Sequence, residues 1–153
     1  METLRPAIPI VLIAALLACA SPPTDADVEA DLRRLSADVR GLGSSPRLVV
    51  LNAGSSMDAW SHVAESKAEG PSVRARALGR RFAKGSQERV GIVVGGPFPQ
   101  LNDRMVLDAL EASGSGPLPG LTLVIVSPEP PEERLRIAAL QRRVKLVHRA
   151  LPE

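Results

Sequence analysis

The stretch Leu121-Thr122-Leu123-Val124-Ile125-Val126 decides the fold class, because it is an almost unbroken run of Leu, Val and Ile. Runs of this kind are typical of strands that are covered on both faces, as in parallel sheets. Two similar runs come earlier, at 48–51 and 90–94, and a fourth run, at 144–147, alternates in the manner of an edge strand. The sequence therefore predicts about four strands.

Helical patterns fill the gaps between these runs. We expect helices over 57–66, 73–83, 101–110 and 132–142, with turns at Gly70-Pro71 and at the Gly- and Ser-rich segment 113–117. Parallel strands need crossover connections, and these are almost always right-handed, so helices come to cover the sheet. The predicted fold is a small three-layer α/β sandwich with about four mostly parallel strands. An antiparallel last strand is the main alternative.

An amphipathic helix is expected before the first strand. Apolar residues recur at spacings of three and four from Val28 to Val39, which places them on one side of a helix over 25–40. Thr24 and Asp27 have the spacing of a capping box at its start. Two heptads are short for a coiled coil, so we expect this helix to pack on its own domain, and residues 25–153 to form a single domain.

The first 18 residues have the pattern of a secretory signal peptide. Arg5 precedes an apolar run from Ala7 to Ala18, which is shorter than the roughly 20 residues that a spanning helix needs. The run ends in Leu16-Leu17-Ala18-Cys19, which resembles the lipobox of bacterial lipoproteins. The resemblance implies cleavage before Cys19, lipidation of Cys19, and a tether over 19–24. The alternative is that Cys19 is an ordinary residue of a signal or anchor helix.

The same resemblance implies a location in the cell envelope. In such lipoproteins an Asp directly after the cysteine favours retention in the inner membrane, and here that position holds Ala20. We therefore expect a protein on the outer membrane, facing the periplasm.

Composition excludes several classes of function. The formal net charge is only +2, and the aromatic residues are limited to Trp60, Phe82 and Phe98, so no nucleic-acid partner is expected. Cys19 is the only cysteine and there are two histidines, which excludes internal disulfides and Cys/His zinc sites. We predict neither a metal nor a cofactor.

Polar loops after the first two predicted strands are candidates for ligand binding. In open parallel sheets, ligands bind beyond the carboxyl ends of the strands. The first loop offers Asn52, Ser55 and Ser56 for an anionic group, and the second offers Gly95 and Gly96; the Pro-rich turn at 127–131 follows the third strand. Ser55 has a competing interpretation as the N-cap of the next helix, with Asp58 closing a capping box.

No motif predicts a catalytic residue. The chain lacks Gly-x-Ser-x-Gly and the Gly-Lys-Ser of a phosphate loop. Ser56, His62 and Asp103 could be drawn as a triad, but their spacing does not support one.

The strongest surface signal is a basic cluster on the predicted helix at 73–83. Its members are Arg74, Arg76, Arg80, Arg81 and Lys84. Val73, Ala77 and Phe82 are expected to pack against the domain. A basic strip of this kind suits anionic lipid headgroups or an acidic partner, although a plain solvated helix face would have the same composition.

The leading hypothesis is a membrane-anchored, non-enzymatic binding or assembly module that contacts another envelope protein or an anionic surface. The alternative is a receptor or enzyme for an anionic small ligand at the strand-end loops. A third possibility is a spacer or oligomerisation unit that uses the helix at 25–40.

Overall fold

The computed structural model describes residues 24–37, 39, 42, 46–53 and 55–151. The predicted signal peptide, Cys19 and most of the tether lie outside these residues. The strands are β1 (Arg47–Val50), β2 (Val90–Gly95), β3 (Leu121–Ser127) and β4 (Lys145–Ala150). The helices are α1 (Asp25–Ala37), α2 (Ser56–Glu69), α3 (Val73–Ala83), α4 (Pro99–Ala112) and α5 (Glu133–Gln141), with a short 3-10 turn, η1 (Lys84–Ser86), after α3.

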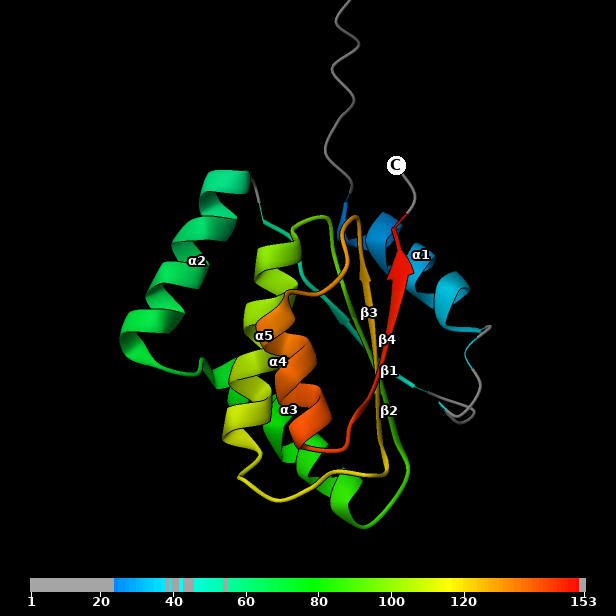
Figure 1. Cartoon of the computed structure of the whole chain (residues 1–153). Coiled ribbons are helices and arrows are strands. Elements are labelled where there is room, and N and C mark those ends of the chain that lie inside the picture. The colour runs from blue at the N-terminus through cyan, green and yellow to red at the C-terminus, as the bar shows by residue number, and fades with distance from the viewer. Residues whose placement is uncertain (1–23, 38, 40–41, 43–45, 54, 152–153) are drawn as a thin grey trace, which may run out of the picture.

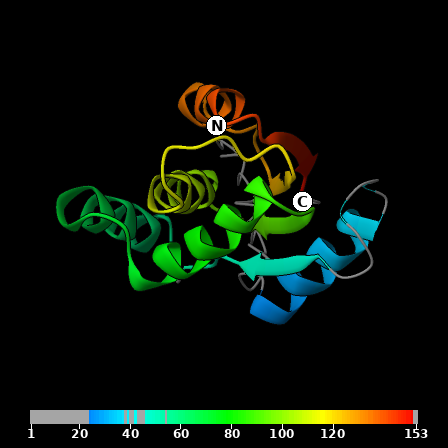
Figure 2. The same ribbon diagram turned by 90° about the horizontal axis from the view of Figure 1, so that it is seen from below.

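The four strands form one sheet in the order β1-β2-β3-β4, and every neighbouring pair is parallel. This confirms the predicted α/β class and excludes the antiparallel last strand. Each crossover connects a strand to its next neighbour, always in the same direction across the sheet. Because all crossovers have the same handedness, α2 to α5 lie on one face of the sheet. The helix that precedes the first strand, α1, covers the other face (Figure 1). Figure 2 shows the resulting three layers from below.

Two cores explain the continuous apolar run in β3. Leu121, Leu123 and Ile125 point into the core under α2 to α5, where Phe82 of α3 is also fully buried. Val124 and Val126 point to the opposite face and pack with Val28 and Leu32 of α1. Because both faces of β3 are covered, both sets of alternating side chains are mostly apolar.

Glycines let the α1 layer lie directly on the sheet. A Cβ on Gly95 would lie 2.3 Å from Leu32 Cδ2, and a Cβ on Gly91 would lie 2.4 Å from the carbonyl oxygen of Leu42. Gly95 is the last residue of β2 and Gly91 the second, so α1 runs antiparallel to the strands. The helix therefore begins at the edge of the sheet where the strands end (Figure 1).

Side-chain hydrogen bonds satisfy backbone groups at the start of α1 and at the end of α4. At the start of α1, Asp27 N–H donates to Thr24 Oγ1 at 3.3 Å, and Thr24 N–H donates to Asp27 Oδ2 at 3.1 Å, which confirms the predicted capping box. At the other end of the domain, Arg142 donates to the carbonyl of Leu110 in the last turn of α4 at 2.9 Å and to that of Gly116 at 2.6 Å. Partial burial lowers the pKa of Arg142.

In the described residues, no helix is both long enough and apolar enough to cross a bilayer.

Candidate functional site

The polar loop after β1 is organised mainly around the start of α2. Asp58 N–H donates to Ser55 Oγ at 3.1 Å, and Ser55 Oγ donates to Asp58 Oδ2 at 2.9 Å, so Ser55 is the N-cap that the sequence predicted. Asn52 Oδ1 accepts from the N–H of Ala53 at 3.0 Å. Ser56 lies exposed in the first turn of α2. Both hydrogen bonds of the Ser55 hydroxyl therefore stabilise the first turn of α2.

The paired glycines after β2 serve close packing. A Cβ on Gly96 would lie 1.7 Å from the carbonyl oxygen of Leu51, so the two backbones are in contact there. At Gly95, the space that a Cβ would fill is taken by the side chain of Leu32. Both glycines are buried, and the order of the strands never reverses, so the sheet lacks the switch point at which such folds open a crevice.

The carboxyl end of β2 is closed by the start of α4. Phe98 is half-buried and packs on the core beneath α2 to α5. Asn102 is fully buried, and its Nδ2 donates to the carbonyl of Gly96 at 3.0 Å. The strand-end residues that the sequence singled out therefore do not converge on one open pocket.

Two residues of the conceivable triad, Asp103 and His62, have separate partners. Asp103 is buried in α4, and its Oδ2 accepts from the N–H of Glu132 at 2.7 Å, which caps α5. Burial raises the pKa of Asp103, and the bond from Glu132 partly offsets this effect. His62 lies on the exposed side of α2, with Nδ1 3.7 Å from Glu65. The part of the chain that the structure describes holds no group of three or more His, Cys, Asp or Glu side chains suited to a metal ion.

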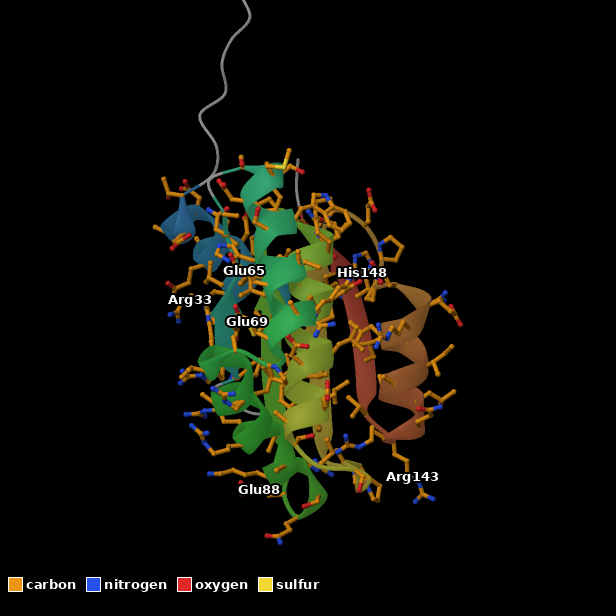
Figure 3. The ribbon with its side chains drawn as sticks, turned by 90° about the vertical axis from the view of Figure 1, so that its left-hand side faces the viewer. Arg33, Glu65, Glu69, Glu88, Arg143 and His148 are labelled. Atoms are coloured by element: carbon orange, nitrogen blue, oxygen red, sulfur yellow. The ribbon has the colours of Figure 1, made fainter. Side chains whose placement is uncertain are left out.

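The basic cluster of α3 forms one continuous exposed face. The buried side of this helix consists of Ala75, Leu78, Gly79 and Phe82. Val73 and Ala77 are exposed, so the expectation that they pack was wrong; at 100° per residue they lie on the outer arc, among the cations. We call the exposed residues Arg74, Arg76, Arg80, Arg81 and Lys84 the basic face. Nitrogen-tipped side chains project outward along α3 in Figure 3.

The cations of the basic face are not neutralised locally. Among the described residues, none of the five lies within 4 Å of a carboxylate. Arg74 Nη2 donates to the carbonyl of Val50 at 2.6 Å, at the open edge of β1. Arg47, Arg74 and Arg81 also surround a small cavity of about 130 Å³ between β1 and α3. Positive charge is therefore concentrated along one edge of the sheet.

The basic face runs toward the edge of the sheet where the strands begin. Arg74 lies beside Val50, the last residue of β1. At the other end, a Cβ on Gly85 would lie 2.7 Å from Leu121 Cβ, at the first residue of β3. Most of the basic face is therefore remote from the edge at which α1 begins.

A larger cavity of about 310 Å³ lies between α2, α4 and the start of α3, next to the carboxyl end of β1. We call it the β1 cavity. Of the predicted ligand-binding residues only Asn52 lines it. Its polar and charged lining consists of Asn52, His62, Glu65, Ser66, Glu69, Ser72, Arg74, Arg104 and Asp108.

A buried ionic network forms one wall of the β1 cavity. Arg104 Nη2 lies 2.7 Å from Asp108 Oδ1, and the two side chains are 15% and 4% exposed. Arg104 Nε donates to Ser66 Oγ at 3.0 Å, and that hydroxyl donates to Asp108 Oδ2. Sequence reasoning missed this network because Ser66 is about forty positions from its partners; only the i, i+4 spacing of Arg104 and Asp108 was visible.

Comparison of the chain with protein-family models, with characterised proteins and with solved structures finds no match. The function must therefore be argued from the geometry of the two sites.

Proposed function

We propose that this protein is a lipid-anchored, non-enzymatic binding module of the cell envelope, whose basic face binds an acidic protein partner. The observation that carries the proposal is the set of five exposed cations, four on α3 and Lys84 directly after it, that have no carboxylate within 4 Å among the described residues. A cation without a local partner can contribute its full attraction to an external anion.

Segregation of charge matters here more than the total. The chain has a formal net charge of only +2, yet α3 holds four cations and no acid, and Lys84 follows it directly. Clustered like charges steer an oppositely charged partner and raise its rate of association, and salt screens this effect. Binding at the basic face should therefore weaken strongly as salt is added.

A protein partner fits the geometry better than the protein's own membrane. If Cys19 is acylated, residues 19–24 reach at most about 20 Å when extended. The anchor then lies near the start of α1, at the carboxyl edge of the sheet, whereas most of the basic face extends toward the amino edge. The basic face would be directed away from the anchoring lipid sheet.

The test compares two variants that each lose four positive charges. The first replaces Arg76, Arg80, Arg81 and Lys84 with Gln on the basic face. The matched control replaces Arg33, Arg34, Arg134 and Arg136 with Gln on α1 and α5. Binding to poly-L-glutamate and to phosphatidylglycerol vesicles is measured between about 50 mM and about 300 mM salt.

We expect the wild type and the control to bind polyglutamate in a salt-sensitive manner, and the basic-face variant to lose at least tenfold in affinity. A photo-crosslinking residue at Ala77 should join the protein to an acidic neighbour in intact cells, whereas one at Leu140 on α5 should not. Equal binding by both variants would refute the proposal, and tighter binding to vesicles than to polyglutamate would favour a lipid surface instead.

The anchor has its own test. Mass spectrometry of the native protein should find residues 1–18 removed and Cys19 acylated. An unmodified Cys19 on an uncleaved chain would remove the anchor from the proposal and leave the binding role of α3 to stand alone.

A further inference from the structure

We propose that the β1 cavity binds a small zwitterion of the amino-acid type with an apolar side chain. This inference concerns α2, α4 and the start of α3, and it does not depend on the function proposed for the basic face. Its support comes from the size of the cavity, the distribution of charge on its walls, and the buried network behind them.

The size and floor of the cavity suit a small molecule with an apolar part. Its volume of about 310 Å³ lies at the lower end of the range for ligand sites. Leu51, Leu101 and Met105 supply the apolar lining, and Leu51 and Leu101 belong to the buried core. An aliphatic side chain placed here would remove apolar surface from water on both partners.

One side of the cavity is acidic. Glu65 and Glu69 are one helical turn apart on α2 and line the cavity together. Figure 3 shows both labelled side chains on the same side of that helix. The last turn of α2 ends here at Gly70, so its carbonyl groups add the partial negative charge of a helix C-terminus. A ligand ammonium group fits this side.

Another part of the same lining offers a guanidinium group. Arg74 lines the same cavity from the first turn of α3, and within the described part of the chain only its Nη2 is engaged, in the bond to Val50. A guanidinium carries five N–H donors, so most of its donors remain for a carboxylate. In the described residues, neither Glu65 nor Glu69 lies within 4 Å of Arg74. Charges of opposite sign thus line one cavity without neutralising each other.

The buried network behind the cavity holds its wall in a fixed arrangement. Asp108 is 4% exposed, and its Oδ1, although 2.7 Å from Arg104 Nη2, accepts no well-aligned hydrogen bond within the described residues. Arg104 is fixed by Ser66 through both Oγ at 3.0 Å and the backbone oxygen at 3.2 Å. Because Asp108 is paired with Arg104, the two together add no net charge to the cavity.

The charge pattern favours a zwitterion over a simple ion. A cation would leave Arg74 uncompensated, and an anion would face two carboxylates. A molecule that carries an ammonium and a carboxylate group can satisfy both sides at once, while its side chain covers the apolar floor.

The experiment uses L-leucine and its two halves as probes. 3-Methylbutylamine lacks the carboxylate, and 4-methylpentanoate lacks the ammonium group. Binding to the purified protein is measured by calorimetry. One variant carries Glu65→Gln and Glu69→Gln, another carries Arg74→Gln, and the control carries Glu111→Gln and Glu129→Gln at exposed acids outside the cavity.

We expect L-leucine to bind at least tenfold more tightly than either half. The Glu65 and Glu69 variant should lose binding of L-leucine and of the amine, the Arg74 variant should lose binding of L-leucine and of the carboxylate, and the control should match the wild type. No saturable binding of L-leucine, or binding of one half as tight as that of the whole, would overturn the inference. Because this set leaves Arg76 to Lys84 intact, its outcome is separate from that of the polyglutamate test.

Discussion

Contact between Leu32 and Gly95 should make the α1 layer sensitive to a pair of substitutions in a non-additive way. Leu32 is fully buried, so Leu32→Ala removes three carbon groups at about 0.8 kcal/mol each and leaves a cavity, which together cost about 3 kcal/mol. Gly95→Ala places a Cβ 2.3 Å from Leu32 Cδ2 and 2.7 Å from the carbonyl oxygen of Val126. Overpacking of this kind costs about 2 kcal/mol.

The double variant should be more stable than the sum of the single effects. Truncating Leu32 frees the space that the new Cβ needs, so we expect the combined loss to fall short of the sum by about 1 kcal/mol. The contact with Val126 remains and limits the recovery. The φ angle of Gly95 is not positive, so alanine introduces no backbone strain to confuse the comparison.

Urea unfolding, followed by circular dichroism, measures the four free energies of the cycle. The control cycle pairs Gly95→Ala with Leu135→Ala, because Leu135 is fully buried in the core on the other face of the sheet. That cycle should be additive within about 0.5 kcal/mol. If the Leu32 cycle were also additive, the direct packing of α1 on Gly95 would be refuted.

Two further predictions concern buried and capping side chains. The pKa of Asp103 is raised in the folded state above its ordinary value of 3.8. Between these two pKa values the folded state binds more protons than the unfolded state, so the contribution of Asp103 to stability falls as pH rises through that window. Asp103→Asn should therefore gain stability relative to the wild type between about pH 3 and about pH 7 in urea unfolding, and a difference that is independent of pH would contradict the assignment. Ser55→Ala should destabilise α2 by about 1 kcal/mol through loss of its N-cap, whereas Ser55→Asp should not. Hydrogen exchange along α2 would detect this, and unchanged protection would show that the cap is unimportant.

The unreversed order of the strands limits where a ligand site can form in this fold. With the strands in chain order and four helices on one face, the carboxyl edge lacks a switch-point crevice. One concave surface, the β1 cavity, forms instead between α2, α4 and the start of α3, beside Leu51 and Arg104. The other candidate site, the basic face, lies exposed on α3, which flanks the edge strand β1 (Figure 2).

The candidate sites were predictable only in part. Ser55 was recognisable as a cap because capping is local and depends on residues three positions apart. The basic face was visible as a cluster, but the side of α3 that is buried was misjudged at Val73 and Ala77, since sequence alone did not show which stripe meets α4 and the sheet. The Arg104 network could not be seen, because its third member, Ser66, comes from another helix.

By itself, the sequence determined the class of fold, the number and order of the elements, and the caps of α1 and α2. These follow from apolar periodicity and from hydrogen bonds between residues that are near in the chain. Only the tertiary structure decided the order of the strands, the assignment of Gly95 and Gly96 to packing, and the placing of α4 beside Glu69 and Arg74 to form one cavity. Those outcomes depend on contacts between distant segments, which local patterns do not encode.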